Sequence, residues 1–328
     1  MTCGLSLKPS GLKTPASVSP ETEQTPASTD RASLTIAGAR VLGRQRLAGL
    51  SDTVDLDADL ILQHATGLRR TDLITRSSEP VGAEAGDRYV GLLERRAAGE
   101  PVAYITGRKH FRSIELFVDR RVLVPRPETD LLVEIGLLAL QERTGTRRVI
   151  DVGTGSGAIA LALASELNDL GRGDVDVVAG DISQDALDVA SRSRNALGLD
   201  GRVELIKSDL LGSVIGRFDL ILANLPYLRT NQCHHSTASE PAQALYAGAD
   251  GLDEYRRLLP QAAGHLEPDG VLACEINPSQ EGEMRRLLSE HIQGDVAVLR
   301  DLAGWDRIVV SGAVDIVRTV ADTWRYGA

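Results

Sequence analysis

Four consecutive residues carry the groups best suited to chemistry: Asn224, Leu225, Pro226 and Tyr227. They follow an apolar run, 218–222, that predicts a buried strand, so they stand where that strand leaves a sheet. The Asn224 side-chain oxygen and the Leu225 carbonyl can accept the two N–H hydrogens of a planar amide or amino group, and the Tyr227 ring can stack on that group. Such a clamp orients the nitrogen and shifts electron density onto it, which a poorly nucleophilic amide needs before it attacks an electrophile.

A glycine-rich turn follows an earlier predicted strand, 147–152, and runs into a predicted helix. Glycines let the backbone approach a ligand closely, and a helix N-terminus favours a negative group. The spacing also fits the loose dinucleotide fingerprint, so the turn alone is compatible with a nicotinamide enzyme. Its candidate ligand-binding residues are Asp151, Gly153, Thr154, Gly155, Ser156 and Gly157.

Two acidic residues end the next two predicted strands. Asp181 follows strand 175–180, where a carboxylate accepts hydrogen bonds from ribose hydroxyls. Asp209 follows strand 202–206 and is placed to meet an adenine amino group. The alternatives are an acid at a helix N-terminus for Asp181, ahead of Ser183, and a solvated loop acid for Asp209.

The elements that must position these residues alternate between strand and helix from residue 147 onward. This alternation implies an α/β domain, 127–311, with a mostly parallel sheet covered by helices on both faces. A helix from Asp130 to about Arg143 precedes the sheet, and Pro127 and Glu128 suit its first turn. Strands are expected at 147–152, 175–180, 202–206, 218–223, 269–275, 295–299 and 305–311, and helices at 156–168, 183–198, 252–265 and 279–290.

The first part of the chain has a different pattern. Residues 1–30 are rich in Ser, Thr and Pro and predict a disordered tail. Residues 31–106 have helical apolar spacing and predict a bundle of about four or five helices that holds a partner or substrate. Alternation in 114–118, followed by the apolar residues 122–124, predicts a β-hairpin in the linker 107–126 with its turn near 119–121. Residues 312–328 are interpreted as a C-terminal tail.

The charge balance limits the classes of function. The 328 residues carry 36 Lys and Arg against 46 Asp and Glu, a formal net charge of −10. Phosphate binding needs clustered basic residues, so stable binding of nucleic acid is not expected. No apolar run approaches the ~20 residues that span a bilayer, and no signal peptide is evident, so no membrane association is expected.

The cysteines and histidines do not have the spacing of a metal-binding motif. The three cysteines, Cys3, Cys233 and Cys274, lie far apart and form no CxxC motif. Reduced thiols in a cytoplasmic protein are the simple interpretation. The only close histidine pair, His234 and His235, lacks the spacing of a helical metal site, and no metal is expected.

Several longer segments carry a family likeness that runs from about Asp52 to Val310. In these segments the chain resembles the bacterial protein-(glutamine-N5) methyltransferases that act on peptide chain release factors. The segments are Glu100-Pro101-Val102-Ala103-Tyr104-Ile105-Thr106-Gly107, Val122-Leu123-Val124-Pro125-Arg126-Pro127-Glu128-Thr129, Asp151 to Gly157, Glu240-Pro241 with Ala244-Leu245 and Asp250-Gly251-Leu252, and Asp301-Leu302-Ala303-Gly304 with Asp306-Arg307.

The resemblance implies a class I (Rossmann-like) methyltransferase sheet, S-adenosyl-L-methionine as donor, and the glutamine of a Gly-Gly-Gln motif in release factors as acceptor. The helical domain would help to hold the release factor, with a monomer as the favoured state. The donor site would include the glycine turn, Asp181, Asp209, Leu210 and Asn224. Residues 224–227 would hold the glutamine amide. Four residues would close over donor and substrate: Arg126, Pro127, Glu128 and Thr129.

One residue departs from the family pattern. The family usually has Asn-Pro-Pro-Tyr, and this chain has Leu225 at the second position. Leu225 keeps the carbonyl that accepts the amide N–H, and Pro226 biases Leu225 towards an extended backbone. The substitution removes rigidity at this position and adds an N–H, so activity is expected to survive.

Other functions remain open from the sequence alone. The same clamp suits a ribosomal-protein glutamine, or adenine N6 in nucleic acid. The adenine enzyme must extrude its base and hold the DNA backbone, which the net charge disfavours. A non-catalytic binding module is disfavoured by the intact glycine turn, Asp181 and Asn224. A nicotinamide oxidoreductase is disfavoured because nothing in the chain resembles its hydride-side acid or base.

Overall fold

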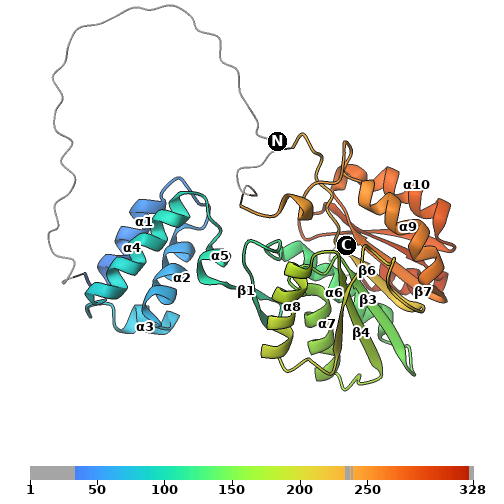
Figure 1. Ribbon diagram of the computed structural model, residues 1–328, viewed down its shortest axis with the longest axis horizontal. Coiled ribbons are helices and arrows are strands. Elements are labelled where there is room, and N and C mark those ends of the chain that lie inside the picture. Colours follow the sequence, from blue (N-terminus) through green and yellow to red (C-terminus); the bar gives the residue numbers. More distant parts are fainter. Residues whose placement is uncertain (1–33, 233–236, 238, 325–328) are drawn as a thin grey trace, which may run out of the picture.

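The structure is a computed structural model that describes residues 34–232, 237 and 239–324. It contains a small helical domain and a larger α/β domain (Figure 1). The tail predicted for residues 1–30 lies outside the described residues. None of the helices in the described ranges is long and apolar enough to cross a membrane.

The helical domain confirms the predicted bundle. Its core is apolar and is built from residues of α1, α2 and α4 with single residues from α3 and α5. Gly43 on α1 gives the closest approach, because a Cβ atom there would lie 2.0 Å from the Tyr89 hydroxyl oxygen. The helices are α1 (Ile36–Leu47), α2 (Val54–Thr66), α3 (Arg70–Thr75), α4 (Ala83–Ala97) and α5 (Val102–Thr106).

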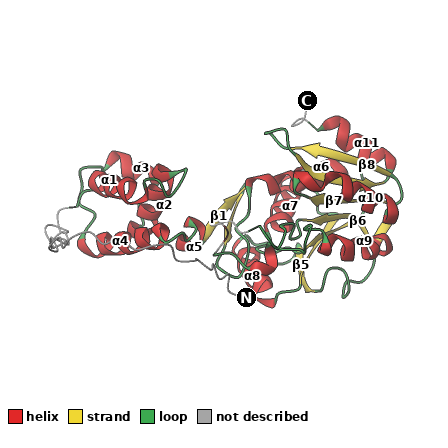
Figure 2. Cartoon of the chain, turned by 90° about the horizontal axis from the view of Figure 1, so that it is seen from above, coloured by secondary structure: helices red, strands yellow, loops and turns green. Residues whose placement is uncertain are grey.

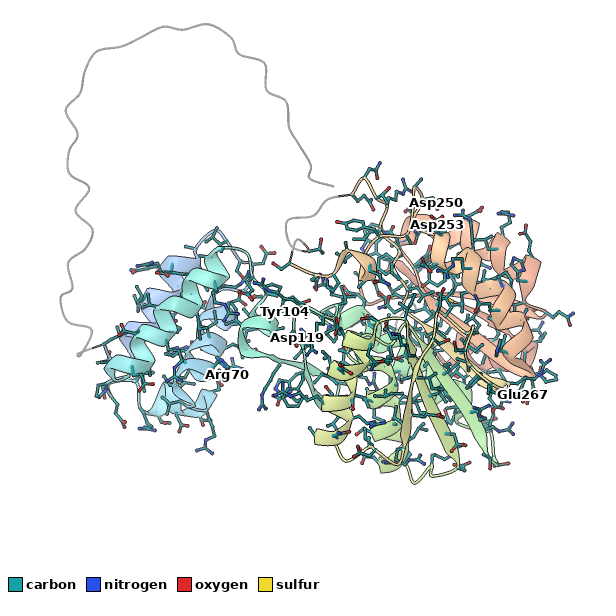
Figure 3. The ribbon with its side chains drawn as sticks, in the orientation of Figure 1. Arg70, Tyr104, Asp119, Asp250, Asp253 and Glu267 are labelled. Carbon is teal, nitrogen blue, oxygen red and sulfur yellow. The ribbon has the colours of Figure 1, made fainter. Side chains whose placement is uncertain are left out.

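A two-stranded hairpin, β1 (Arg108–Phe111) and β2 (Ile114–Phe117), joins the two domains (Figure 2). The hairpin was predicted, but its turn was placed wrongly near 119–121. The turn is at Arg112, whose guanidinium bonds Glu166 of the α/β domain with Nη2–Oε2 of 2.8 Å. The apolar residues 122–124 suggested a second strand, yet the partner of β2 is the polar strand β1. Tyr104 lies at this junction (Figure 3) and donates a hydrogen bond to the Val122 carbonyl.

The α/β domain contains a seven-stranded sheet in the order β5-β4-β3-β6-β7-β9-β8. The first five strands in this order, from β5 to β7, are paired in parallel, and β9 is antiparallel to both of its neighbours, β7 and β8. This arrangement confirms the predicted mostly parallel sheet. The strands are β3 (Arg147–Val152), β4 (Val175–Asp181), β5 (Val203–Lys207), β6 (Phe218–Ala223), β7 (Leu266–Glu275), β8 (Asp295–Arg300) and β9 (Asp306–Gly312).

Helices cover both faces of this sheet. Alternate residues along a strand point to opposite faces, and Val149 and Ile150 accordingly belong to different apolar cores. One core is shared with α6 (Asp130–Leu140), α7 (Ala158–Asp169) and α8 (Gln184–Ala196), and the other with α9 (Asp253–His265) and α10 (Glu281–His291). Three short 3-10 helices complete the described elements: η2 (Pro127–Thr129), η4 (Ala242–Ala244) and η5 (Pro278–Gln280).

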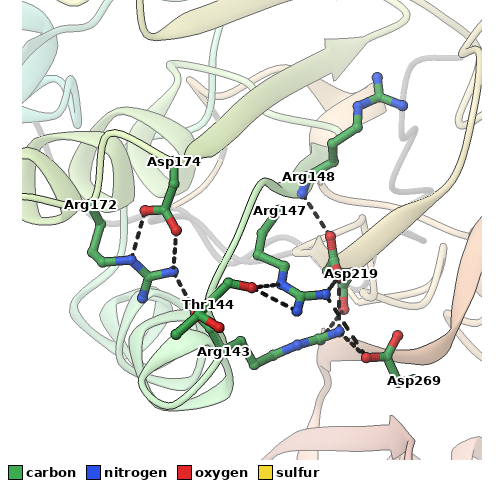
Figure 4. Close-up of polar contacts among 8 residues, drawn as sticks. All are labelled: Arg143, Thr144, Arg147, Arg148, Arg172, Asp174, Asp219 and Asp269. Carbon is green, nitrogen blue, oxygen red and sulfur yellow. Dashed lines mark hydrogen bonds and ion pairs between the residues drawn. The ribbon is translucent and has the colours of Figure 1, made fainter.

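An ionic cluster fixes the amino edge of the sheet, opposite the residues singled out for chemistry (Figure 4). Asp219 on β6 is only 5% exposed. Its Oδ1 accepts from Arg143 at 2.8 Å and Arg147 at 2.9 Å, and its Oδ2 accepts from the Arg148 backbone N–H at 2.8 Å. A buried carboxylate is tolerated only when paired in this way. The cluster therefore ties the start of β3 to the start of β6.

The interpretation of residues 312–328 as a tail was wrong. Gly312 ends β9, and the chain continues into α11 (Val314–Thr323). Val317, Val320 and Trp324 are buried in the same core as α6 and α7. The Trp324 indole donates to the Arg300 carbonyl at 2.9 Å. The segment was missed because these apolar residues form one face only when the chain is wound at helical spacing.

Replacing Val320 with alanine tests this docking. Val320 is fully buried, so Val320→Ala should lower the free energy of unfolding by about 2 kcal/mol through lost burial and a residual cavity. Thr319→Ala, on the exposed side of α11, is the matched control and should change stability by less than about 0.5 kcal/mol. Urea denaturation measures both values. Equal stability of the two variants would mean that α11 does not pack as described.

Candidate functional site

The parallel strands bring the predicted site residues to one edge of the sheet. Val152, the last residue of β3, is paired with Gly180 of β4 and with Ala223 of β6. The residues that follow these strands therefore meet. A cavity of about 440 Å³ opens between them, and a second of about 270 Å³ lies beside it. The two cavities share Leu123, Arg126, Asn224, Leu225, Pro226 and Ala244.

The glycine turn forms part of the wall of the larger cavity. Gly153, Thr154, Gly155 and Ser156 all line it. Gly153 has a φ of 74°, and a Cβ atom there would lie 2.8 Å from Leu225 Cδ2. Only glycine combines this left-handed backbone with such close contact. The turn and the 224–227 segment are thus packed directly on each other.

Asp181 lines the same cavity and is held by backbone donors. Its Oδ2 accepts from the Gly155 N–H at 2.8 Å, and its Oδ1 accepts from the Ser183 N–H at 2.9 Å. Burial raises the pKa of this carboxyl, and the backbone donors act in the opposite direction. The cap of α8 is Ser183, whose hydroxyl accepts from the Ala186 N–H at 3.2 Å. Asp181 is therefore not needed as a helix cap and stands where the ribose contact was predicted.

Four of the predicted site residues do not line either cavity: Asp151, Gly157, Pro127 and Glu128. Asp151 is 1% exposed, and its Oδ2 accepts from the Thr154 hydroxyl at 2.6 Å. Burial raises its pKa to about 7. Gly157 precedes α7 with a φ of 84°. Asp151 therefore supports the turn from within β3, and Gly157 leads from the turn into α7. Pro127 and Glu128 are exposed residues of η2.

Asp209 and Leu210 both line the larger cavity. Asp209 Oδ2 forms an ion pair of 2.5 Å with Arg257 on α9, so its carboxylate is already engaged. Leu210 is buried and supplies an apolar wall. An adenine bound beside Leu210 would contact its apolar side chain and the Asp209–Arg257 ion pair. The sequence had suggested an unpaired Asp209 carboxylate instead.

The 224–227 segment is oriented by hydrogen bonds. Asn224 Nδ2 donates to the Thr129 hydroxyl at 2.9 Å, and its side-chain oxygen has no hydrogen-bond partner among the described residues. The Leu225 N–H, which a proline would lack, donates to the Tyr255 hydroxyl oxygen at 3.4 Å. The Tyr227 hydroxyl donates to Glu275 Oε1 at 3.2 Å. Each of these three residues is thus fixed by a partner distant in the sequence.

Arg126 lines both cavities and is held by an acid, Glu240, that the sequence marked only as part of a family segment and not as a site residue. Glu240 is buried, pairs with the Arg126 guanidinium and accepts from the Val124 N–H at 3.1 Å. Burial raises the pKa of Glu240, and Arg126 opposes that shift. The pair fastens the 122–126 segment over the cavities.

Glu275, at the end of β7, was also missed. It is 1% exposed, and burial raises its pKa to about 7, while the Thr129 hydroxyl, Arg307 and the Tyr227 hydroxyl act to lower it. An acid directly after an apolar strand was the signal used to select Asp181. The same signal would have selected Glu275.

The described residues contain no group of three or more His, Cys, Asp or Glu side chains that could hold a metal ion. Cys274 is the free cysteine in the described ranges, and it is buried. Burial raises the pKa of its thiol, so Cys274 is an unreactive core residue.

A mostly parallel sheet with this strand order, a glycine turn after β3 and an acid at the end of β4 define a methyltransferase that uses S-adenosyl-L-methionine. Residues 128–304 match the family model described as methyltransferase small domain, and residues 39–107 match the PrmC N-terminal domain. The chain belongs to the release factor glutamine methyltransferase family.

Curated relatives resemble the chain over most of its length, and each is named release factor glutamine methyltransferase. The Agrobacterium fabrum protein is 34% identical over 284 residues, which are 84% of this chain and 96% of the relative. The protein of Xylella fastidiosa strain Temecula1 is 40% identical over 271 residues, 80% of this chain and 95% of the relative. The Moorella thermoacetica protein is 40% identical over 270 residues, 80% and 93% respectively.

Removal of the Asp181 carboxylate tests the donor site. Asp181→Ala frees the Gly155 N–H and deletes the predicted ribose acceptor, so affinity for S-adenosyl-L-methionine should fall about 10- to 100-fold, as expected for charge-assisted hydrogen bonds. Asp185→Ala, an exposed acid on the same cavity wall, is the control and should retain its affinity. Titration calorimetry gives both dissociation constants. An unchanged constant for Asp181→Ala would refute the ribose role.

Proposed function

We propose that this protein methylates the side-chain nitrogen of the glutamine in the Gly-Gly-Gln motif of peptide chain release factors. The observation that carries the proposal is the orientation of Asn224. Its nitrogen is bound to Thr129, so its oxygen is the group left to accept a substrate N–H at the junction of the two cavities. The names and coverage of the curated relatives support the same substrate.

The groups at the larger cavity fit the donor. Backbone N–H groups of the glycine turn, the Asp181 carboxylate and the apolar wall at Leu210 suit a charged amino acid, a ribose and a purine respectively. When bound, S-adenosyl-L-methionine supplies an electrophilic methyl group. The residues assigned to hold it are Gly153, Thr154, Gly155, Ser156, Asp181, Leu210 and Asn224.

The acceptor half of the site lies at the smaller cavity. Asn224 Oδ1 and the Leu225 carbonyl accept the two N–H hydrogens of the glutamine amide, and the Tyr227 ring packs on its plane. An amide held by both hydrogens presents its nitrogen in one direction, which orients the attack. Arg126 and Thr129 close the entrance, because both line the larger cavity and both are held in place, Arg126 by Glu240 and Thr129 by its bond to Asn224.

The helical domain and the hairpin bind the body of the release factor. The match of residues 39–107 to the PrmC N-terminal domain supports this assignment. With a net charge of −10, the protein binds neither membranes nor nucleic acid stably and works as a monomer in the cytoplasm, where release factors act.

Asn224→Ala is the direct test of the clamp. The variant loses a preorganised acceptor for the amide, so turnover should fall by about 10²-fold or more. Donor affinity should fall much less, because the other residues assigned to the donor remain. The assay is mass spectrometry of a release factor incubated with isotopically labelled donor, which also locates the label.

Gln243→Ala is the control, since Gln243 is an exposed amide on the wall of the larger cavity. It should methylate at the wild-type rate. Label on the Gly-Gly-Gln glutamine with wild-type protein supports the proposed acceptor. Near-wild-type turnover by Asn224→Ala would remove Asn224 from the mechanism.

Leu225→Pro tests whether the departure from the family pattern matters. The substitution removes the N–H that donates to Tyr255, so stability should fall by about 1 kcal/mol, while turnover stays within a few-fold because the carbonyl is retained. Tyr255→Phe, which removes this hydrogen bond together with those to the Ala223 and Glu275 carbonyls and leaves residue 225 unaltered, is the control and should cost at least as much stability. Loss of turnover in Leu225→Pro alone would show that the site has diverged from the family geometry.

A further inference from the structure

One turn on the wall of the larger cavity has a strained backbone. Leu210 has a φ of 53°, and among the non-glycine residues that the structure describes only Arg112 shares a positive φ. A left-handed backbone is unfavourable for a residue that carries a side chain, so it persists only where neighbouring groups hold it in place. Leu210 is buried and lines the cavity next to Asp209. The groups that hold this turn therefore determine the shape of the wall.

Two side chains of α9 hold the turn, one on each side of Leu210. Arg257 Nη2 donates to Asp209 Oδ2 at 2.5 Å. Gln261 Oε1 accepts from the Leu211 N–H at 3.0 Å. Residues four apart lie on the same face of a helix, so both side chains reach the turn from one rigid element. The residues before and after Leu210 are thus fixed together.

Arg257 is in turn held by Glu254, which lies one helical turn earlier. Its Nη1 donates to Glu254 Oε2 at 2.7 Å, and its Nη2 is bonded to Asp209. All three side chains line the larger cavity. A guanidinium is planar and its N–H groups point in fixed directions, so these two bonds orient the Asp209 carboxylate. Only Oδ2 of that carboxylate is engaged, and Oδ1 has no hydrogen-bond partner among the described residues.

We propose that Arg257 and Gln261 are positioning residues that make the donor site specific for an adenine base. They hold the 209–211 turn so that the Leu210 side chain packs on the purine and Asp209 Oδ1 faces the 6-amino group. This inference rests on the proposed donor site and does not depend on the identity of the acceptor.

The specificity follows from the direction of one hydrogen bond. A carboxylate accepts hydrogen bonds, and the 6-amino group of adenine donates them. Hypoxanthine carries a 6-oxo group instead, so two acceptors would face each other and a hydrogen bond would be lost. A carboxylate that rotates freely would not hold an oxygen at this place. Because Arg257 fixes Oδ2, it also fixes the direction of Oδ1.

A purely structural role for the ion pair predicts a different result. The side chains of Arg257 and Asp209 are 47% and 50% exposed. Exposed ion pairs contribute little to stability, because solvent screens them. If this pair only fastened α9 to the turn, replacing Arg257 would lower the melting temperature slightly and would weaken all forms of the donor equally. Selectivity for the base therefore isolates the proposed role.

The experiment uses titration calorimetry of the full chain with S-adenosyl-L-homocysteine, which is the donor without its methyl group, and with S-inosyl-L-homocysteine. The two compounds differ only at position 6 and in the proton at N1 of the purine. Wild-type protein should bind the adenosyl compound at least about 10-fold more tightly, a modest ratio because Asp209 is half-exposed. In Arg257→Met the ratio should fall below about threefold, mainly through weaker binding of the adenosyl compound.

Arg256→Met is the matched control. Arg256 is on the same helix and is paired with Asp250, and it does not line either cavity. It should keep the wild-type ratio. Gln261→Leu should weaken binding of the adenosyl compound about three- to tenfold, because the Leu211 N–H loses its acceptor. Gln261→Glu keeps that acceptor and should keep the affinity within about twofold.

Three results would overturn the proposal: equal binding of both compounds by wild-type protein, an unchanged ratio in Arg257→Met, or tighter binding of the adenosyl compound by that variant. If Arg257→Met does not fold, the comparison of Gln261→Leu with Gln261→Glu still decides, because equal affinities would refute the anchoring of the turn. Circular dichroism establishes the fold of each variant.

Asp181→Ala separates this inference from the donor site on which it rests. If Asp181→Ala weakens binding of both compounds while Arg257→Met keeps the wild-type ratio, the donor site stands and the inference is refuted. Unchanged binding in Asp181→Ala would refute the assigned donor site and the inference with it. Both measurements omit the acceptor, so neither result depends on which protein is methylated.

Discussion

The pairing of β3 with β6 is the constraint on which the site depends. In this parallel register Val152 lies opposite Ala223, so the next residues, Gly153 and Asn224, leave the sheet side by side. One strand ends in the glycine turn and the other in the clamp. The Asp219 cluster fixes the same two strands at their opposite ends, where the Asp219 carboxylate is paired with arginine side chains and accepts a backbone N–H. A shift of one residue would move every side chain to the wrong face and separate the two halves of the site.

Acidic side chains have different partners at the two edges of the sheet. At the amino edge Asp219 is neutralised by arginines, whereas at the carboxyl edge Asp151 and Asp181 are held by N–H and O–H donors and form no ion pair within the described ranges. Burial raises the pKa of both acids. Asp209 at the same edge is paired with Arg257, but Asp181 lines the cavity without a cationic partner in the described residues, and an unpaired carboxylate favours a positively charged ligand beside it. This property suits a sulfonium donor better than the negatively charged phosphates of a dinucleotide.

Most of the sheet could be predicted from the sequence because it depends on local signals. The strands predicted at 147–152 and 218–223 coincide with β3 and β6, and the alternation with helices implies the parallel order. The hairpin turn and α11 were missed for tertiary reasons. Arg112 turns where it can reach Glu166, and α11 is defined by the groove it covers. Neither condition is visible in a short stretch of sequence.

The site was predicted in its cavity-facing parts and missed in its support. Asn224 and Asp181 stand directly after strands, where position alone suggests chemistry. Thr129 was predicted to close over donor and substrate, but its bond to Asn224, 95 residues away, was not predicted. Glu275, which bonds Tyr227 from 48 residues away, was not predicted at all, because only the folded sheet brings the two together. Asp151 was given a direct contact because it adjoins the glycines, although its strand is covered on both faces.

Leu225 shows how the supporting residues accommodate a change in the clamp itself. A proline at this position would fix the backbone through its ring. With leucine, the free N–H is bonded to Tyr255, and Tyr255 is bonded to the Glu275 carbonyl, so the backbone is held by neighbours instead. The leucine side chain also fills the space above Gly153, where no Cβ atom would fit. Rigidity that the family places in a covalent ring is supplied in this protein by packing and two hydrogen bonds.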